Sequence, residues 1–121
     1  MKRVILVSDG SPELAETLLA IGNELDLTIV ADPSAKLIAR ARQEVPSLIV
    51  LDIEQKDALE LLSLLKTGLS TREIPVIVVG GEDTVTLREM ALEIGADAFV
   101  EKPLGPDFLP KVATFLDNQK K

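Results

Sequence analysis

The chain of 121 residues contains no cysteine, no histidine, no tryptophan and no tyrosine. The lack of cysteine excludes disulfide bonds, thiol nucleophiles and cysteine-based zinc sites. The lack of histidine excludes catalytic triads with an imidazole base and metal sites built on imidazole, and it prevents this chain from being a phosphohistidine donor. The three phenylalanines are the only aromatic residues, so the chain has little with which to stack a base or a flavin.

Positive charge and long apolar runs are also scarce. The formal net charge of −7 argues against direct nucleic-acid binding, because such binding uses lysine and arginine to neutralise phosphates. No apolar run approaches the roughly 20 residues of a membrane span, and residues 1–7 are too short for a signal peptide. We therefore expect a cytoplasmic protein without membrane insertion, with a single domain over residues 1–121.

Five short apolar runs predict β-strands. The run over residues 48–51 is unbroken and ends on Asp52, which suits a central parallel strand that is covered on both faces. The other expected strands cover residues 4–7, 27–30, 76–79 and 98–100. Apolar residues at helical spacing between these runs predict five helices, over residues 11–25, 34–45, 57–69, 83–94 and 105–116.

Two of these helices allow more detailed expectations. For the helix over 57–69, Asp57 and Glu60 form the pattern of a capping box, and Gly68 marks the end. Its expected inner residues are Leu59, Leu62, Leu65 and Leu69. For the helix over 83–94, Gly95 is a natural C-terminal stop. Its expected inner residues are Leu87, Met90, Ala91 and Ile94.

Polar residues follow the ends of the expected strands. Asp9 and Asp52 follow two of the strands, Gly80-Gly81 follows a third, and Lys102 follows the last. In a parallel sheet all carboxyl ends meet at one edge, where open α/β sheets form their ligand sites. Two carboxylates, a double glycine and a lysine at this edge predict a site for a cation and a phosphoryl group. The double glycine is either a bend after the strand or a cradle of backbone N–H groups for phosphate.

These residues resemble bacterial response-regulator receiver domains of two-component signalling, over nearly the whole chain. The matching segments are residues 4–9, 48–52, 74–79 and 95–103. The last is the most specific, because a Gly-Ala-Asp-x-aromatic run before Lys-Pro is typical of the family. The resemblance implies an α/β flavodoxin-like (βα)5 three-layer sandwich, with a parallel five-stranded sheet in the order 2-1-3-4-5. Strands one and three are then neighbours, which places Asp9 beside Asp52.

The resemblance also implies roles for individual residues. Asp52 matches the phosphoacceptor, Lys102 matches the lysine that pairs with Asp52 and with the phosphoryl group, and Phe99 matches the aromatic switch residue. Asp9 matches a magnesium ligand. Since Mg²⁺ takes one or two carboxylates together with waters and phosphate oxygens, Asp9, Asp52 and the backbone carbonyl near Glu54 would supply the protein's share. This interpretation requires an Asp52 carboxylate that is not sealed away from solvent.

Three features depart from the family pattern. Ser8 stands where the family usually has a second acid, and the loss of one carboxylate at about 4 Å removes roughly 1–4 kcal/mol of attraction per charge pair. Magnesium binding is therefore expected to be weakened. Gly80 stands where the family has threonine or serine, so the usual hydroxyl that couples to the aromatic residue at Phe99 is missing. The segment 53–57 is also about two residues short and contains neither proline nor glycine.

We weigh three functions. The first is a stand-alone receiver domain of a phosphorelay, which accepts a phosphoryl group on Asp52 from a histidine kinase or a phosphotransfer protein and acts through a downstream protein. The second is an atypical receiver, a protein-interaction module without phosphorylation-dependent switching. The third, a flavin or nucleotide carrier of the same fold, is disfavoured because Asp9 would repel a phosphate and no Gly-x-Gly-x-x-Gly follows the first strand. None of the three requires a turnover enzyme, and a homodimer remains open.

Overall fold

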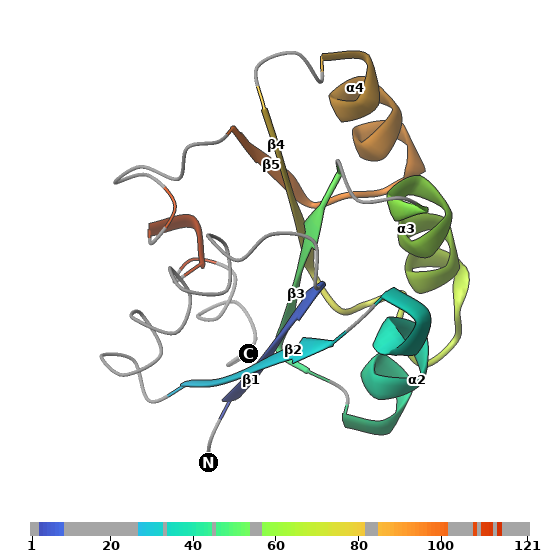
Figure 1. Ribbon diagram of the computed structural model, residues 1–121, viewed down its shortest axis with the longest axis vertical. Coiled ribbons are helices and arrows are strands. Elements are labelled where there is room, and N and C mark those ends of the chain that lie inside the picture. Colours follow the sequence, from blue (N-terminus) through green and yellow to red (C-terminus); the bar gives the residue numbers. More distant parts are fainter. Residues whose placement is uncertain are drawn as a thin grey trace.

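The computed structural model describes residues 3–8, 27–32, 34–44, 46–53, 57–81, 85–101, 108, 110–112 and 114. Five strands form one parallel sheet in the order β2-β1-β3-β4-β5 (Figure 1). The strands are β1 (Arg3–Ser8), β2 (Leu27–Asp32), β3 (Leu48–Asp52), β4 (Val76–Gly80) and β5 (Ala98–Glu101). All five strands and their order were expected from the sequence, and each strand extends one or two residues beyond the apolar run that predicted it.

The central strands are buried along their whole length. Every residue of β3 and β4 is buried, although alternate side chains of a strand point to opposite faces of a sheet. Both faces of these strands are therefore covered, as the unbroken apolar runs predicted.

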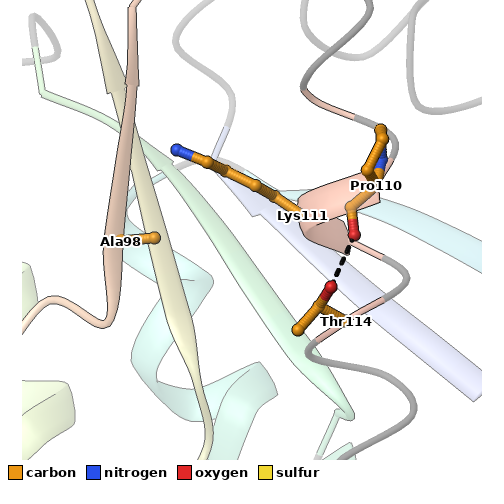
Figure 2. Close-up of a pocket in the computed structure, with 4 residues that line it drawn as sticks. All are labelled: Ala98, Pro110, Lys111 and Thr114. Atoms are coloured by element: carbon orange, nitrogen blue, oxygen red, sulfur yellow. Dashed lines mark hydrogen bonds between the residues drawn. The ribbon is translucent and has the colours of Figure 1, made fainter.

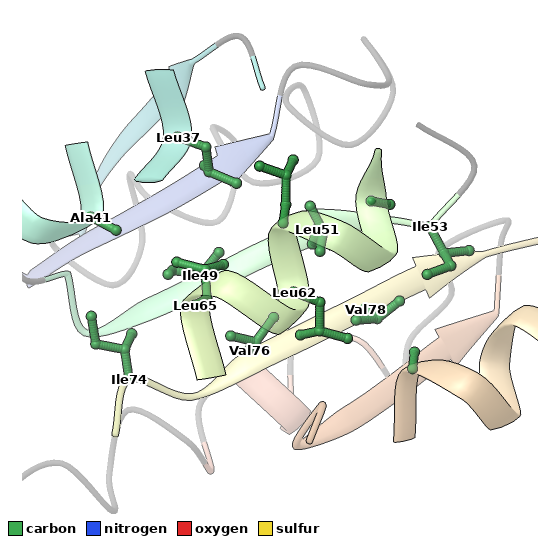
Figure 3. Packing of buried hydrophobic residues seen from close by; sticks show 13 residues of the cluster. Leu37, Ala41, Ile49, Leu51, Ile53, Leu62, Leu65, Ile74, Val76 and Val78 are labelled. Atoms are coloured by element: carbon green, nitrogen blue, oxygen red, sulfur yellow. The ribbon is translucent and has the colours of Figure 1, made fainter. Parts of the chain in front are cut away.

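Three helices cover one face of this sheet: α2 (Ser34–Glu44), α3 (Ala58–Thr67) and α4 (Val85–Ile94) (Figure 1). Their buried side chains form a core with those of β3 and β4, in which Leu62 and Leu65 of α3 lie over Ile49 and Val76 (Figure 3). On the other face, residues 108, 110–112 and 114 have helical backbone, and Phe108 and Val112 are buried. These layers are those of the flavodoxin-like fold. The helix expected over 11–25 lies outside the described residues, and within the described residues no helix is long and apolar enough to cross a membrane.

The start of α3 differs from the sequence expectation. Asp57 has a left-handed backbone, with φ of 69°, and its side chain makes no capping hydrogen bond. The predicted capping box is therefore wrong. Aspartate is one of the few residues that tolerate this conformation, and a cap needs an extended backbone to aim its carboxylate at the first turn. The carbonyl of Asp57 instead accepts the first helical hydrogen bond, from the N–H of Leu61, at 2.9 Å.

Two predicted core residues are on the surface. Leu69 is 86% exposed because α3 ends at Thr67 and Gly68 continues in an extended conformation, so the helical spacing no longer applies. Met90 is 43% exposed. In α4 only Leu87, Ala91 and Ile94 pack against the core. The buried face of this helix is therefore narrower than the sequence pattern predicted.

A polar cluster ties α3, β4 and β5 together at the amino end of the sheet. Asp97 Oδ2 accepts a hydrogen bond from the N–H of Val76 at 2.8 Å and from Lys66 Nζ at 3.0 Å. Lys66 Nζ also donates to the carbonyl of Ile74 at 3.2 Å. The expected end of α4 at Gly95 is confirmed. The φ of Gly95 is 130°, a backbone conformation that glycine adopts readily and other residues rarely do, and a Cβ atom there would contact the methylene groups of Lys66. Asp97 is thus an anchor that holds three elements by a single carboxylate.

Candidate functional site

Asp52 is the last residue of β3, at the carboxyl edge of the sheet. Its backbone pairs with Val79 of β4, and the next residue, Ile53, donates a hydrogen bond to the carbonyl of Val79 at 2.8 Å. The aspartate is therefore held by regular pairing on the β4 side up to the very end of the strand. This is the position at which an open parallel sheet presents a side chain to a ligand.

The same packing leaves Asp52 only 1% exposed. The interpretation of the sequence required a carboxylate that solvent and a phosphodonor reach, and this exposure does not meet that requirement. Leu51 and Ile53, the neighbours of Asp52 along the chain, are buried as well. A phosphodonor reaches this carboxylate only if the groups around it move aside.

Gly80 ends β4 one position further along the same edge. It pairs with Glu101 of β5 and is buried. Because paired residues of parallel strands project to the same face, a side chain at position 80 would share a face with Phe99 and Glu101. Gly80 has no side chain. At the altered switch position expected from the sequence, this edge of the sheet therefore lacks a hydroxyl group.

Phe99 lies in the middle of β5 and is half-buried against the core beneath α3 and α4. The guanidinium carbon of Arg88, from α4, lies 5.5 Å from the centroid of its ring, which is a cation–π contact. The sequence analysis did not identify Arg88. It lies beside the inner stripe of α4, one residue after Leu87, but no local pattern pairs it with a residue on β5.

Three of the predicted site residues, Asp9, Glu54 and Lys102, lie outside the described residues. Ser8 is described through its backbone, as the last residue of β1, where it pairs with Asp32 of β2. The structure therefore places Asp52, Gly80 and Phe99 on adjacent strands, and the contacts among Asp52, Asp9 and Lys102 stay a prediction.

A cavity of about 300 Å³ lies away from this edge, between β5 and the C-terminal helical segment (Figure 2). It is lined by Ala98, the first residue of β5, and by Pro110, Lys111 and Thr114. Thr114 Oγ1 donates to the carbonyl of Pro110 at 2.9 Å, and Lys111 Nζ donates to the carbonyl of Phe99 at 3.4 Å. Lys111 and Thr114, the polar side chains among the described lining residues, already have partners, so these residues form no constellation of reactive groups.

The sheet order and the acidic residue that ends the central strand define a flavodoxin-like α/β domain with a carboxylate at the carboxyl edge of its sheet. Residues 5–114 match the family model of the response regulator receiver domain. The chain belongs to this family.

Similar proteins agree with this assignment. The nitrogen assimilation regulatory protein NtrX of Azorhizobium caulinodans is 32% identical over 117 residues, which cover 90% of this chain and 25% of that protein. Response regulator GtcR of Aneurinibacillus migulanus is 30% identical over 107 residues, which cover 88% of this chain and 44% of that protein. The chain thus spans less than half the length of these curated relatives.

Solved structures show the same fold. NtrX from Brucella abortus, in a complex with ADP, superimposes with a TM-score of 0.82 at 28% identity, over 99% of this chain and 28% of that one. The BeF3-activated receiver domain of RstA from Klebsiella pneumoniae superimposes with a TM-score of 0.81 at 23% identity, over 94% and 98% of the two chains.

Proposed function

We propose that this receiver domain accepts a phosphoryl group on Asp52. The observation that supports this most is the position of Asp52, at the carboxyl end of the central strand of a receiver-family sheet. In the proposed step a carboxylate oxygen of Asp52 attacks the phosphorus of a phosphohistidine. The new O–P bond replaces the N–P bond, and the departing imidazole nitrogen takes up a proton from solvent.

The register of the sheet supports the partners proposed for Asp52. β1 and β3 pair in parallel up to Val7 and Val50. The same register, continued by two residues on each strand, would bring Asp9 to Asp52. Lys102 directly follows Glu101, which pairs with Gly80, so we expect its ammonium group at the same edge, where it would neutralise charge on the transferred group.

Magnesium would supply further charge neutralisation at this edge. Its preferred ligands are oxygens, and Asp52 offers carboxylate oxygens of the required kind. In the described part of the chain no three acidic residues gather in a way that would hold a metal. The proposed set therefore adds Asp9 and the backbone carbonyl of Glu54 to Asp52, and we expect weaker binding than in a site with a second acid at Ser8.

Within this proposal, the domain of residues 1–121 receives its phosphoryl group in the cytoplasm, from a histidine kinase or a phosphotransfer protein, and passes the signal to another protein. It accepts one group per molecule and turns over no substrate. Direct binding to nucleic acid is not expected at a net charge of −7. Homodimer formation stays an open part of the proposal.

Incubation with acetyl phosphate and Mg²⁺ tests phosphoacceptance without a known kinase. Intact-mass measurement is expected to show the addition of one phosphoryl group to the wild-type protein and none to Asp52→Asn. The matched control is Asp57→Asn: Asp57 is exposed, and asparagine tolerates its left-handed backbone. No mass gain in the wild type at high donor concentration, or an equal gain in Asp52→Asn, would refute the proposal.

Two observations favour a second candidate, an interaction module without phosphorylation-dependent switching. Asp52 is 1% exposed, and Gly80 offers no hydroxyl to a phosphoryl oxygen. This candidate predicts closely similar amide spectra with and without beryllofluoride and Mg²⁺. Large shifts around Gly80 and Phe99 would exclude it.

A further inference from the structure

Phe99 is contacted by cationic side chains from two different parts of the fold. Arg88 of α4 lies over its ring, at 5.5 Å from the guanidinium carbon to the ring centroid. Lys111, from the C-terminal helical segment, donates to its carbonyl at 3.4 Å. The ring itself is half-buried and packs against the core. One residue of β5 is thus connected to the helices on both faces of the sheet.

Strand β4 provides no comparable contact to this ring. Phe99 pairs with Val78, and the next residue of β4 on the same face is Gly80. Val78 is an apolar core residue, and Gly80 has no side chain. Among the described residues, the cationic contact to the ring comes from Arg88 of α4, a helix that packs against both β4 and β5.

We propose that Arg88 is a positioning residue: it holds the ring of Phe99 beneath α4, and this cation–π pair couples the carboxyl edge of the sheet to α4. An arginine suits this task because its planar guanidinium stacks on an aromatic face, whereas the compact ammonium of a lysine is more strongly hydrated. The holding of the ring is independent of phosphorylation. The claim that the pair transmits a phosphorylation signal rests on the proposed function of Asp52.

Fluorine NMR tests whether Arg88 holds the ring. The three phenylalanines are replaced biosynthetically by 4-fluorophenylalanine, and Phe99→Leu assigns the resonance of the ring at position 99. Arg88→Gln is expected to shift that resonance and to leave the buried Phe108 unchanged, while Arg88→Lys is expected to give a smaller shift because it keeps the cation. The matched control is Arg72→Gln, a change of an exposed arginine in the loop after α3. An Arg88→Gln shift no larger than that of Arg72→Gln overturns the proposal.

Amide spectra with beryllofluoride and Mg²⁺ test the coupling. In the wild type, shifts are expected in residues 85–94 of α4. A cation–π pair at an exposed site changes the ratio of two conformations by roughly two- to fivefold. Arg88→Gln is therefore expected to reduce the α4 shifts by the loss of population that corresponds to this change in the ratio. Acetyl phosphate is expected to label Asp52 in this variant to the same extent as in the wild type.

The outcomes separate the two proposals. Equal α4 shifts in the wild type and in Arg88→Gln overturn the coupling and leave phosphoacceptance intact. A wild type that acquires no phosphoryl group overturns the proposed function, and with it the coupling to phosphorylation. The fluorine resonance of unmodified protein still decides whether Arg88 holds the ring.

Discussion

Removal of the Asp97 carboxylate is expected to destabilise the fold by more than its partly exposed position suggests. The side chain of Asp97 is 35% exposed and that of Lys66 is 13% exposed. Yet Asp97 Oδ2 is the acceptor for the Val76 N–H, at 2.8 Å, as well as for Lys66 Nζ, at 3.0 Å. Asp97→Ala therefore removes this acceptor from the part-buried N–H at the start of β4 and from the ammonium group of Lys66.

The magnitude follows from these two losses. A hydrogen bond to a charged group contributes about 1.5–3 kcal/mol, and a solvent-screened ion pair contributes about 0.2–1 kcal/mol. We expect Asp97→Ala to cost about 2–3 kcal/mol of unfolding free energy. Asp97→Asn retains an oxygen for the Val76 N–H and is expected to cost about 1 kcal/mol, on the same scale of interaction energies.

Urea denaturation measures these differences. With a slope near 2 kcal/mol per molar urea for a small domain, Asp97→Ala is expected to lower the midpoint by about 1–1.5 M. The control is Glu73→Ala, because Glu73 is an exposed loop acid and such substitutions usually stay within about 0.5 kcal/mol. If Asp97→Ala were no more destabilising than Glu73→Ala, the anchoring of three elements by Asp97 would be refuted.

Three further predictions concern α3 and its surroundings. Leu62→Ala, at a fully buried site, is expected to cost about 2–5 kcal/mol, and Leu69→Ala, at a site 86% exposed, under about 0.5 kcal/mol; equal urea midpoints would contradict this core. Gly95→Ala is expected to cost about 1–3 kcal/mol because φ is 130° there, and an unchanged melting temperature would count against that backbone. Thr71→Val removes the hydroxyl that donates to the Leu65 carbonyl at 2.7 Å and is expected to cost about 1–3 kcal/mol, which chemical denaturation would detect.

The strands were predictable from the sequence because a strand buried on both faces needs an unbroken apolar run, as in residues 48–51 and 76–79. The helix details were less predictable. Leu69 continues the apolar spacing of α3, but the chain leaves the helix at Gly68. Asp57 and Glu60 have the spacing of a capping box, but the backbone of Asp57 is left-handed. The sequence pattern does not predict this backbone conformation.

Contacts between residues far apart in the chain could not be predicted from local sequence patterns. The sequence identified Gly95-Ala-Asp97 as a family segment, but the partners of Asp97 are Lys66 of α3, 31 residues away, and Val76 of β4, 21 residues away. The pairing of Arg88 with Phe99 joins a helix to a strand in the same way. The apolar run over residues 48–51 predicted a central strand, but it did not predict that Asp52 at its end would be only 1% exposed.

Chemical identification of the phosphorylated residue tests the proposed function most directly. Protein treated with acetyl phosphate and Mg²⁺ is reduced with borohydride, which converts an aspartyl phosphate to homoserine, and the peptides are sequenced by mass spectrometry. We predict homoserine at position 52 in the wild type and none in protein that received no phosphodonor. Homoserine at another aspartate, or at no position despite a phosphoryl-sized gain in intact mass, would contradict the assignment of Asp52 as the phosphoacceptor.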